Sequence, residues 1–265
     1  ITMKKIYLFL FTLSLAAIIS SCSEDFLDIK AKGSFDESIL ASPAGVSSML
    51  TGAYAMLNDG NSYGPDLMIA SVRAGDIFKG SDPGDQPAML EASRQQWSTG
   101  NSYVSGPFRN WYTAIDRCNS VLKLLPDVEG MSDAQKNQIE AEARFLRAHY
   151  YFYLIRFFVN IPWIDETATT YLVPNTVDND GSTYVNCWPM ISADMDFARK
   201  NLPETQSDVG RPNKWAADIY YAKIQMYRAS WMNGDNPNGY TEARTILNNA
   251  IENGVTGNNL PYGLL

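Results

Sequence analysis

Histidine and cysteine are both scarce in this sequence, and each shortage limits the chemistry that the chain can perform. His149 is the single histidine among 265 residues, so a metal site built from several histidines is excluded. The three cysteines, Cys22, Cys118 and Cys187, lack the close spacing of a zinc site. A nucleophile–histidine–acid triad could run only through His149, which lies inside an expected helix, where a structural role is the simpler interpretation. We expect no metal and no cofactor.

Basic residues are outnumbered by acidic ones. The 21 Lys and Arg residues face 29 Asp and Glu residues, which gives a formal net charge of −8. Such a chain repels phosphate backbones, so nucleic acid is not an expected partner. The sequence also lacks a phosphate-binding glycine loop, a Gly-x-Ser-x-Gly elbow and a His-Glu-x-x-His motif. We therefore expect a protein that is not an enzyme.

The N-terminal segment has the three parts of a secretory signal. Two lysines follow Met3, an uncharged apolar stretch runs from Ile6 to Ile19, and two serines lead into Cys22. The apolar stretch is shorter than the roughly 20 residues that a membrane-spanning helix needs. A cysteine directly after small residues is typical of a bacterial lipoprotein signal, in which Cys22 is acylated and becomes the mature N-terminus. An ordinary signal peptide or a single-pass anchor stays open.

The sequence indicates three regions. We expect a signal peptide over residues 1–21, a polar tether over residues 22–41, and one helical domain over residues 42–265. Cys118 and Cys187 are expected as buried free thiols, although a disulfide between them stays open. Two residues precede Met3, and the chain stops at Leu265 without a finished element. We interpret it as a fragment whose C-terminal part is missing.

Apolar residues recur at helical spacing through most of the expected domain. Helix-start signals are Ser42 before Pro43, Pro107, Ser132 with Gln135 in a capping box, Pro189, Pro212 and Thr241. The corresponding helices are expected to end near Asn58, Pro126, Val159, Leu202, Gly234 and Asn253. A short helix could form over Ala88–Trp97, and short strands over Thr170–Val173 and Thr183–Asn186. Such helix pairs must stack to bury their apolar faces, which predicts a mainly α, tetratricopeptide-like fold with long irregular loops.

The long loop from Gly60 to Gly106 carries the best candidate for a binding site. Trp97, Asn101 and Tyr103 lie together before the expected helix at Pro107, and Arg73 and Asp76 lie upstream. Aromatic faces beside amide and carboxylate groups suit the apolar faces and hydroxyl rims of sugars. We predict ligand binding through Trp97, Asn101, Tyr103 and Asp76. Trp97 could instead simply close the loop onto the core.

One segment carries a family resemblance. Glu142–Trp163, EARFLRAHYYFYLIRFFVNIPW, resembles the signature of the SusD/RagB outer-membrane lipoproteins of Bacteroidota. Three further pieces agree in order: the leader ending in SSCSEDFLD, Trp111–Asn119 (WYTAIDRCN) and Gly210–Ala217 (GRPNKWAA). The resemblance covers nearly the whole mature chain. Members of this family are usually much longer than 265 residues, in agreement with a missing C-terminal part.

The resemblance implies a function and partners. It implies a tetratricopeptide-like scaffold, tethered through acylated Cys22 to the outer face of the outer membrane. It implies a TonB-dependent transporter of the SusC type as partner, and capture of glycan for import as the role. The family uses the loop before the Pro107 helix for ligand, which extends the glycan role to Trp97 and Asn101.

Other functions stay open on the sequence. A lipoprotein of the same transporter complex could capture peptide or act as a scaffold. A glycoside hydrolase would need two carboxylates facing each other across a cleft, and Asp76, Asp82, Asp85 and Asp116 are numerous enough to supply them. The missing motifs make this the weakest hypothesis.

Overall fold

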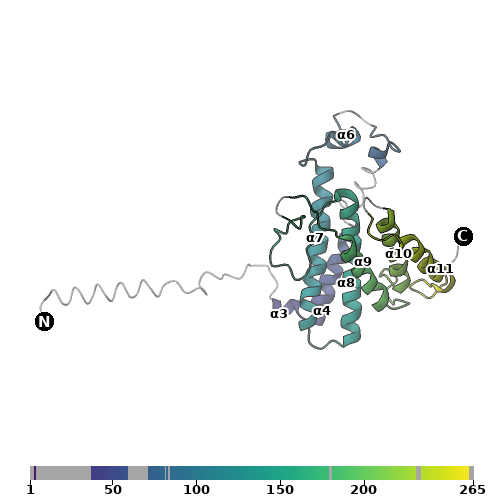
Figure 1. The fold of residues 1–265 in the computed structure, drawn as a ribbon. Helices are drawn as coiled ribbons and strands as arrows, with labels where there is room; N and C mark the ends of the chain where they lie inside the picture. Colours follow the sequence, from purple (N-terminus) through teal and green to yellow (C-terminus); the bar gives the residue numbers. More distant parts are fainter. Residues whose placement is uncertain are drawn as a thin grey trace. The chain divides into compact units, whose positions relative to one another are not determined.

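The computed structural model describes residue 3 and residues 37–58, 71–80, 82, 84–178, 181–230 and 234–262 (Figure 1). The chain forms two units, residues 1–39 and residues 40–265, and the second contains the packed helices. Outside the described residues lie Cys22, the predicted signal apart from residue 3, and most of the predicted tether.

Helices make up the regular structure of the described part of the chain. They are α3 (Glu37–Leu40), α4 (Pro43–Ala55), η1 (Met56–Asn58), α6 (Pro87–Ser93), α7 (Ser102–Leu124), η2 (Leu125–Asp127), α8 (Asp133–Phe158), α9 (Trp188–Asn201), α10 (Lys214–Ser230) and α11 (Gly239–Asn253). A further helical turn covers residues 71–74. The prediction of a mainly α fold is confirmed. No helix formed by these residues combines the length and the apolar character needed to cross a membrane.

The long helices pack in chain order. α4 packs on α7, α7 on α8, α8 on α9, α9 on α10 and α10 on α11 (Figure 1). Large side chains that are almost completely buried fill the space between them: Trp111, Leu146, Tyr150, Tyr151, Phe152, Ile191, Met195 and Ile224. Each helix pair thus buries its apolar face against its neighbours, as in tetratricopeptide-like stacks.

The central helix α8 follows its sequence signals closely. The Ser132 hydroxyl accepts a hydrogen bond from the Gln135 N–H at 3.3 Å, and the Gln135 side chain accepts one from the Ser132 N–H at 2.9 Å. This is the predicted capping box. Buried residues lie around most of the helix, and α8 packs against α4 and α7 as well as α9. Helix α8 is therefore packed on more than one side.

Helix α7 begins at Ser102, so the prediction of a start at Pro107 is wrong. The Asn101 side chain accepts a hydrogen bond from the Tyr103 N–H at 3.0 Å and caps the helix. Pro107 therefore lies inside α7, where it lacks an N–H for the helical ladder. The Asn101 cap and the hydrogen bonds from Asn101 to α6 fix the first turn of α7, which precedes Pro107 in the chain.

The starts of α10 and α11 also differ from the prediction. α10 starts at Lys214 rather than Pro212, because the Asn213 side chain accepts from the Ala216 N–H at 2.9 Å. α11 starts at Gly239 rather than Thr241. A Cβ at Gly239 would lie 2.2 Å from the Gln225 carbonyl oxygen on α10, so only glycine allows this close approach of the two helices.

The strands predicted at Thr170–Val173 and Thr183–Asn186 are absent from the described residues. Only an isolated bridge between Thr176 and Tyr184 forms in this loop. A lone short pair of extended segments lacks the third strand that would stabilise it. Cys118 and Cys187 are both free and buried, which confirms the prediction for these two thiols.

Candidate ligand-binding site

Asn101 joins α6 to α7. Its side-chain NH₂ group donates to the Ala88 carbonyl oxygen at 2.9 Å and to Glu91 Oε2 at 3.0 Å, while its Oδ1 caps α7. The residue is buried. Both amide donors are therefore already used within the chain, and Asn101 holds the shape of the loop that carries the other predicted site residues.

The remaining predicted residues are Trp97, Tyr103 and Asp76. Trp97 is half-buried, and the Arg73 guanidinium carbon lies 4.2 Å from the centroid of its ring. Tyr103 is half-buried and donates its hydroxyl to Gln86 Oε1. Asp76 is exposed, and its N–H donates to the Ser71 carbonyl oxygen at 3.0 Å. The structure thus brings Trp97 to Arg73 and Tyr103 to Asn101.

Beside this junction lies a cavity of about 540 Å³, which we call the arginine pocket. The described residues that line it are Arg73, Ala74, Gln95, Arg156, Phe157, Val159 and Tyr227. They come from the loop before α6, the residues after α6, the end of α8, and α10. Sequence reasoning missed this pocket because only tertiary packing brings these distant segments together.

The backbone of the arginine pocket contains two unusual conformations. Gln95 has φ 58° and Val159 has φ 62°. Val159 is the centre of a γ-turn in which the Asn160 N–H donates to the Phe158 carbonyl oxygen at 2.6 Å. A β-branched residue in this region costs about 1–3 kcal/mol, and such residues cluster at functional sites.

A second cavity, which we call the α7 groove, has a volume of about 470 Å³. Its lining residues are Phe108, Arg109, Tyr112, Thr113, Ile115, Asp116, Asn119, Pro162, Ile164 and Tyr171. Phe108 is 38% exposed and its ring centroid lies 4.8 Å from that of Tyr112. Tyr171 is 75% exposed and donates its hydroxyl to Asp116 Oδ1 at 2.9 Å. Aromatic and polar groups therefore meet here too.

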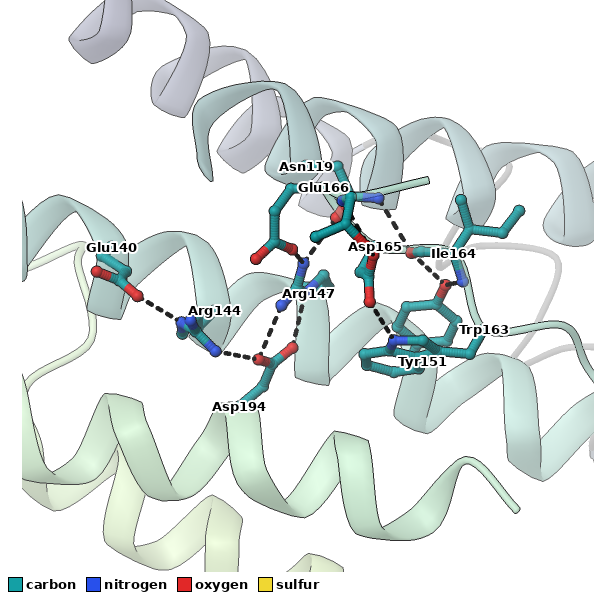
Figure 2. Close-up of polar contacts among 11 residues, drawn as sticks. Asn119, Glu140, Arg144, Arg147, Tyr151, Trp163, Ile164, Asp165, Glu166 and Asp194 are labelled. Carbon is teal, nitrogen blue, oxygen red and sulfur yellow. Dashed lines mark hydrogen bonds and ion pairs between the residues drawn. The ribbon is translucent and has the colours of Figure 1, made fainter. Parts of the chain in front are cut away.

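A buried ionic network lies behind the α7 groove, centred on Arg147 of α8 (Figure 2). Arg147 Nε donates to Asp194 Oδ2 at 2.6 Å, and its Nη2 donates to Asp194 Oδ1 at 2.9 Å. Its Nη1 donates to Asn119 Oδ1 at 2.8 Å and to Glu166. Arg144 also reaches Asp194, at 3.1 Å, and pairs with Glu140 at 2.8 Å. The network joins α7, α8 and α9 to the loop at Glu166.

Aromatic residues attach the same loop to α8 (Figure 2). The Tyr151 hydroxyl donates to the Ile164 carbonyl oxygen at 2.8 Å and accepts from the Ile164 N–H at 2.7 Å. Trp163 stacks on Tyr151 with ring centroids 4.2 Å apart and donates to Asp165 at 3.1 Å. These contacts fix the Pro162–Ile164 wall of the α7 groove.

The pieces of sequence that carry the family resemblance contact one another. Asn119, from the Trp111–Asn119 piece, accepts from Arg147. Arg211, from the Gly210–Ala217 piece, pairs with the buried Glu142 at 2.7 Å. Both partners lie on α8, in the Glu142–Trp163 segment. The signature is therefore a packing framework that holds the loops in place.

Charge interactions shift the pKa of two loop carboxyls. Burial acts to raise the pKa of Glu166, but the charge and hydrogen bond of Arg147 outweigh it and hold the pKa below its ordinary value. Burial likewise acts to raise the pKa of Asp165, but hydrogen bonds from Thr167 and Trp163 lower it. Both groups are therefore charged at neutral pH.

His149 lies among the rings of Tyr150, Tyr153 and Tyr220, with centroids 5.0–5.4 Å away. Burial, together with the charge of Lys223, lowers its pKa to about 3. The imidazole is therefore neutral at physiological pH and forms part of an aromatic cluster. Within the described part of the chain, no group of three His, Cys, Asp or Glu side chains could hold a metal ion.

The comparisons with known proteins agree with this architecture. A SusD-like protein of Bacteroides ovatus is 29% identical over 83% of this chain and 39% of its own length. SusD-like protein P2 of Formosa agariphila is 27% identical over 80% of this chain and 41% of its own length. The solved structure of surface glycan-binding protein A from Bacteroides fluxus is 25% identical and superposes with a TM-score of 0.67, covering 84% of this chain and 45% of that protein.

The chain spans about two fifths of the length of these two curated relatives. A family model described as starch-binding and associating with the outer membrane matches residues 25–226, which is most of the chain. The stacked helix pairs of this chain agree with the fold of the SusD-like proteins. The chain belongs to the SusD-like family.

Proposed function

We propose that this protein is a non-enzymatic cell-surface lipoprotein that captures glycan and delivers it to a SusC-like, TonB-dependent transporter for nutrient uptake. The match of residues 25–226 to a family described as starch-binding and associating with the outer membrane carries the proposal. The glycan-binding protein of Bacteroides fluxus, with the same fold, supports it by its name. The transporter is the partner implied by the family resemblance of the sequence.

Glycan contact is proposed at the α6–α7 junction. Trp97 and Tyr103 are partly exposed and serve as stacking platforms, and the exposed Asp76 accepts hydrogen bonds from sugar hydroxyls. Asn101 belongs to the same site, where its contacts with Ala88 and Glu91 hold the platforms in place. Stacking and a few hydrogen bonds give weak affinity, which repeated sugar units can raise through multivalency.

The proposed attachment to the membrane is covalent. Cys22 is acylated after removal of residues 1–21, residues 22–41 form the tether, and residues 42–265 belong to the binding domain. The apolar segment Ile6–Ile19 directs export, and the lipid on Cys22 holds the mature protein at the outer membrane.

Affinity electrophoresis tests the proposed site. The full-length protein, purified in detergent, is run through native gels containing starch, laminarin, xylan, pectin or carrageenan. We expect one glycan to retard the protein, and Trp97→Ala to weaken that retardation about fivefold, because one stacking platform is lost. The matched control is Tyr240→Ala, which removes an exposed aromatic side chain from α11.

Two results would count against the proposal. Equal retardation of the Trp97→Ala and wild-type proteins would remove Trp97 from the site. Absence of retardation by every glycan would favour capture of peptide or a scaffold role at the transporter.

A further inference from the structure

We propose that the arginine pocket binds an anionic substituent, a carboxylate or a sulfate, on the captured glycan. This inference rests on the proposed function and specifies the class of glycan. Two positively charged side chains line the pocket. Arg73 and Arg156 come from separate segments and face one cavity, and no acidic side chain is among its described lining residues.

Aromatic rings hold both guanidinium groups in position. The Arg73 guanidinium carbon lies 4.2 Å from the Trp97 ring centroid, and that of Arg156 lies 5.0 Å from the Tyr227 centroid and 5.0 Å from the Phe152 centroid. A cation–π contact fixes an arginine without using its N–H donors. These donors are then suited to bind planar carboxylates or sulfates through paired hydrogen bonds.

Positive charge accumulates on this side of α8 and α10. Burial first, and then the charge of Arg156, lowers the pKa of Lys223, which lies on α10 one turn before Tyr227. The charge of Arg156 therefore lies close enough to act on Lys223. The whole chain carries a formal net charge of −8, so an acidic ligand needs such a local positive site.

The pocket also lies next to the proposed stacking platform. Arg73 contacts Trp97 and also lines the pocket, so the proposed stacking platform and the pocket share this arginine. The cavity volume of about 540 Å³ lies within the range of about 300–1,000 Å³ that is typical of small-molecule sites. Gln95 and Val159, with their positive φ angles, line the same cavity, as expected of a site whose shape is fixed by the surrounding packing.

Affinity electrophoresis with charged and neutral polymers tests the inference. Full-length protein is compared in gels containing starch or laminarin as neutral glycans, polygalacturonate as a carboxylated glycan, and carrageenan as a sulfated glycan. We expect an acidic polymer to retard the protein more strongly than either neutral polymer. Retardation by polygalacturonate alone identifies the carboxylate, and retardation by carrageenan alone identifies the sulfate.

Charge-removing variants assign that preference to the pocket. Arg73→Gln and Arg156→Gln should each weaken retardation by the acidic polymer at least about tenfold, since each removes a charged hydrogen-bond donor. Arg73→Lys, which keeps the positive charge, should retain part of the retardation by the acidic polymer. The matched control, Arg244→Gln, removes an exposed arginine from α11 and should leave retardation unchanged. Arg73 is exposed, so its variant keeps the fold even if the half-buried Arg156 does not tolerate change.

The outcomes separate this inference from the proposed function. Retardation by starch or laminarin that equals or exceeds retardation by the acidic polymers overturns the inference and leaves the proposed function intact. The inference is also overturned, with the proposed function intact, if both glutamine variants bind the acidic polymer as strongly as the wild type does. If no polymer retards the protein, the proposed function and the inference both fail.

Discussion

At the residue scale, α8 places the charge of Arg147 inside the core of the helical domain. The side chains of Arg147 and Asp194 are 3% and 4% exposed, and together they bridge α8 and α9. A buried ion pair does not always stabilise a fold, but removing one partner leaves the other charge without compensation in a poorly solvated place. Arg144 binds the same aspartate from the protein surface, so the two arginines allow a direct comparison.

We expect Arg147→Met to lower the free energy of unfolding by about 3–5 kcal/mol, because Asp194 and Glu166 lose their buried partner. Arg144→Met should cost no more than about 1 kcal/mol, because its ion pairs are partly exposed to solvent. Urea unfolding followed by circular dichroism measures both. An equal loss of unfolding free energy in the two variants would mean that burial does not determine how much each arginine stabilises the fold.

The lowered pKa of Glu166 makes part of the stability depend on pH. A carboxyl whose pKa is lower in the folded state stabilises the fold above the unfolded-state value of 4.5, and this contribution is lost as the pH falls through the folded pKa. Glu166→Gln should therefore be less stable than the wild type at pH 7, and the difference should shrink below pH 4.5. Urea unfolding between pH 7 and pH 3 tests this. A difference that stays constant with pH would exclude the Arg147–Glu166 ion pair as its cause.

At the scale of elements, capping side chains set the starts of α7, α8 and α10. Ser132 starts α8, Asn213 starts α10 and Asn101 starts α7. Asn101 has a second role, because its amide group also bonds to Ala88 and Glu91 of α6. The short helix α6, and with it the loop that carries Trp97, depends on this one junction.

Asn101→Ala should lower the free energy of unfolding by about 1–2 kcal/mol, because α7 loses its cap and α6 loses its tie to α7. Ser102→Ala, a change of the neighbouring exposed residue, should stay within about 0.5 kcal/mol of the wild type. Thermal unfolding gives both values. A cost for Ser102→Ala as large as that for Asn101→Ala would show that the cap is not responsible.

The elements also show what local sequence can predict. The capping box and the apolar periodicity of α8 gave its correct start and end, because both signals act within a few residues. The start of α7 was assigned to Pro107, a common first helical residue. The residue that sets the start is Asn101, which lies six positions before that proline and caps the helix with its side chain. The α4 cap at Ser42 was predicted correctly for the same local reason as α8.

The candidate site was less predictable than the helices. Trp97, Asn101 and Tyr103 could be selected because they are close in sequence. The hydrogen bonds from Asn101 to Ala88 and Glu91 join residues 13 and 10 positions apart and could not be predicted in this way. Arg156 and Tyr227 could not be selected, since they meet Arg73 only through the packing of α8 and α10 against the loop. Local sequence patterns contain no information about a pocket that residues from distant segments line together.

At the scale of the whole molecule, the chain has a helical scaffold of the SusD-like family, to which we add a proposed lipid anchor. Helices and the irregular segments between them together line the two cavities. The proposed attachment to the membrane is made through Cys22.

Cys22→Ala should release the protein from the membrane fraction of cells, because the proposed acylation site is lost. The wild-type protein should remain with the outer membrane and incorporate labelled palmitate. Fractionation followed by immunoblotting, together with the labelling, measures both. A Cys22→Ala protein that stays in the outer membrane and still incorporates the label would contradict anchoring through this cysteine.

The central claim is that the protein captures glycan without cleaving it. The most direct test incubates full-length protein with the glycan that retards it in native gels and then measures the polymer's chain length by size-exclusion chromatography. We expect clear retardation and an unchanged chain length after prolonged incubation. Shortening of the polymer by the protein, or failure of every glycan in the panel to bind, would contradict the account.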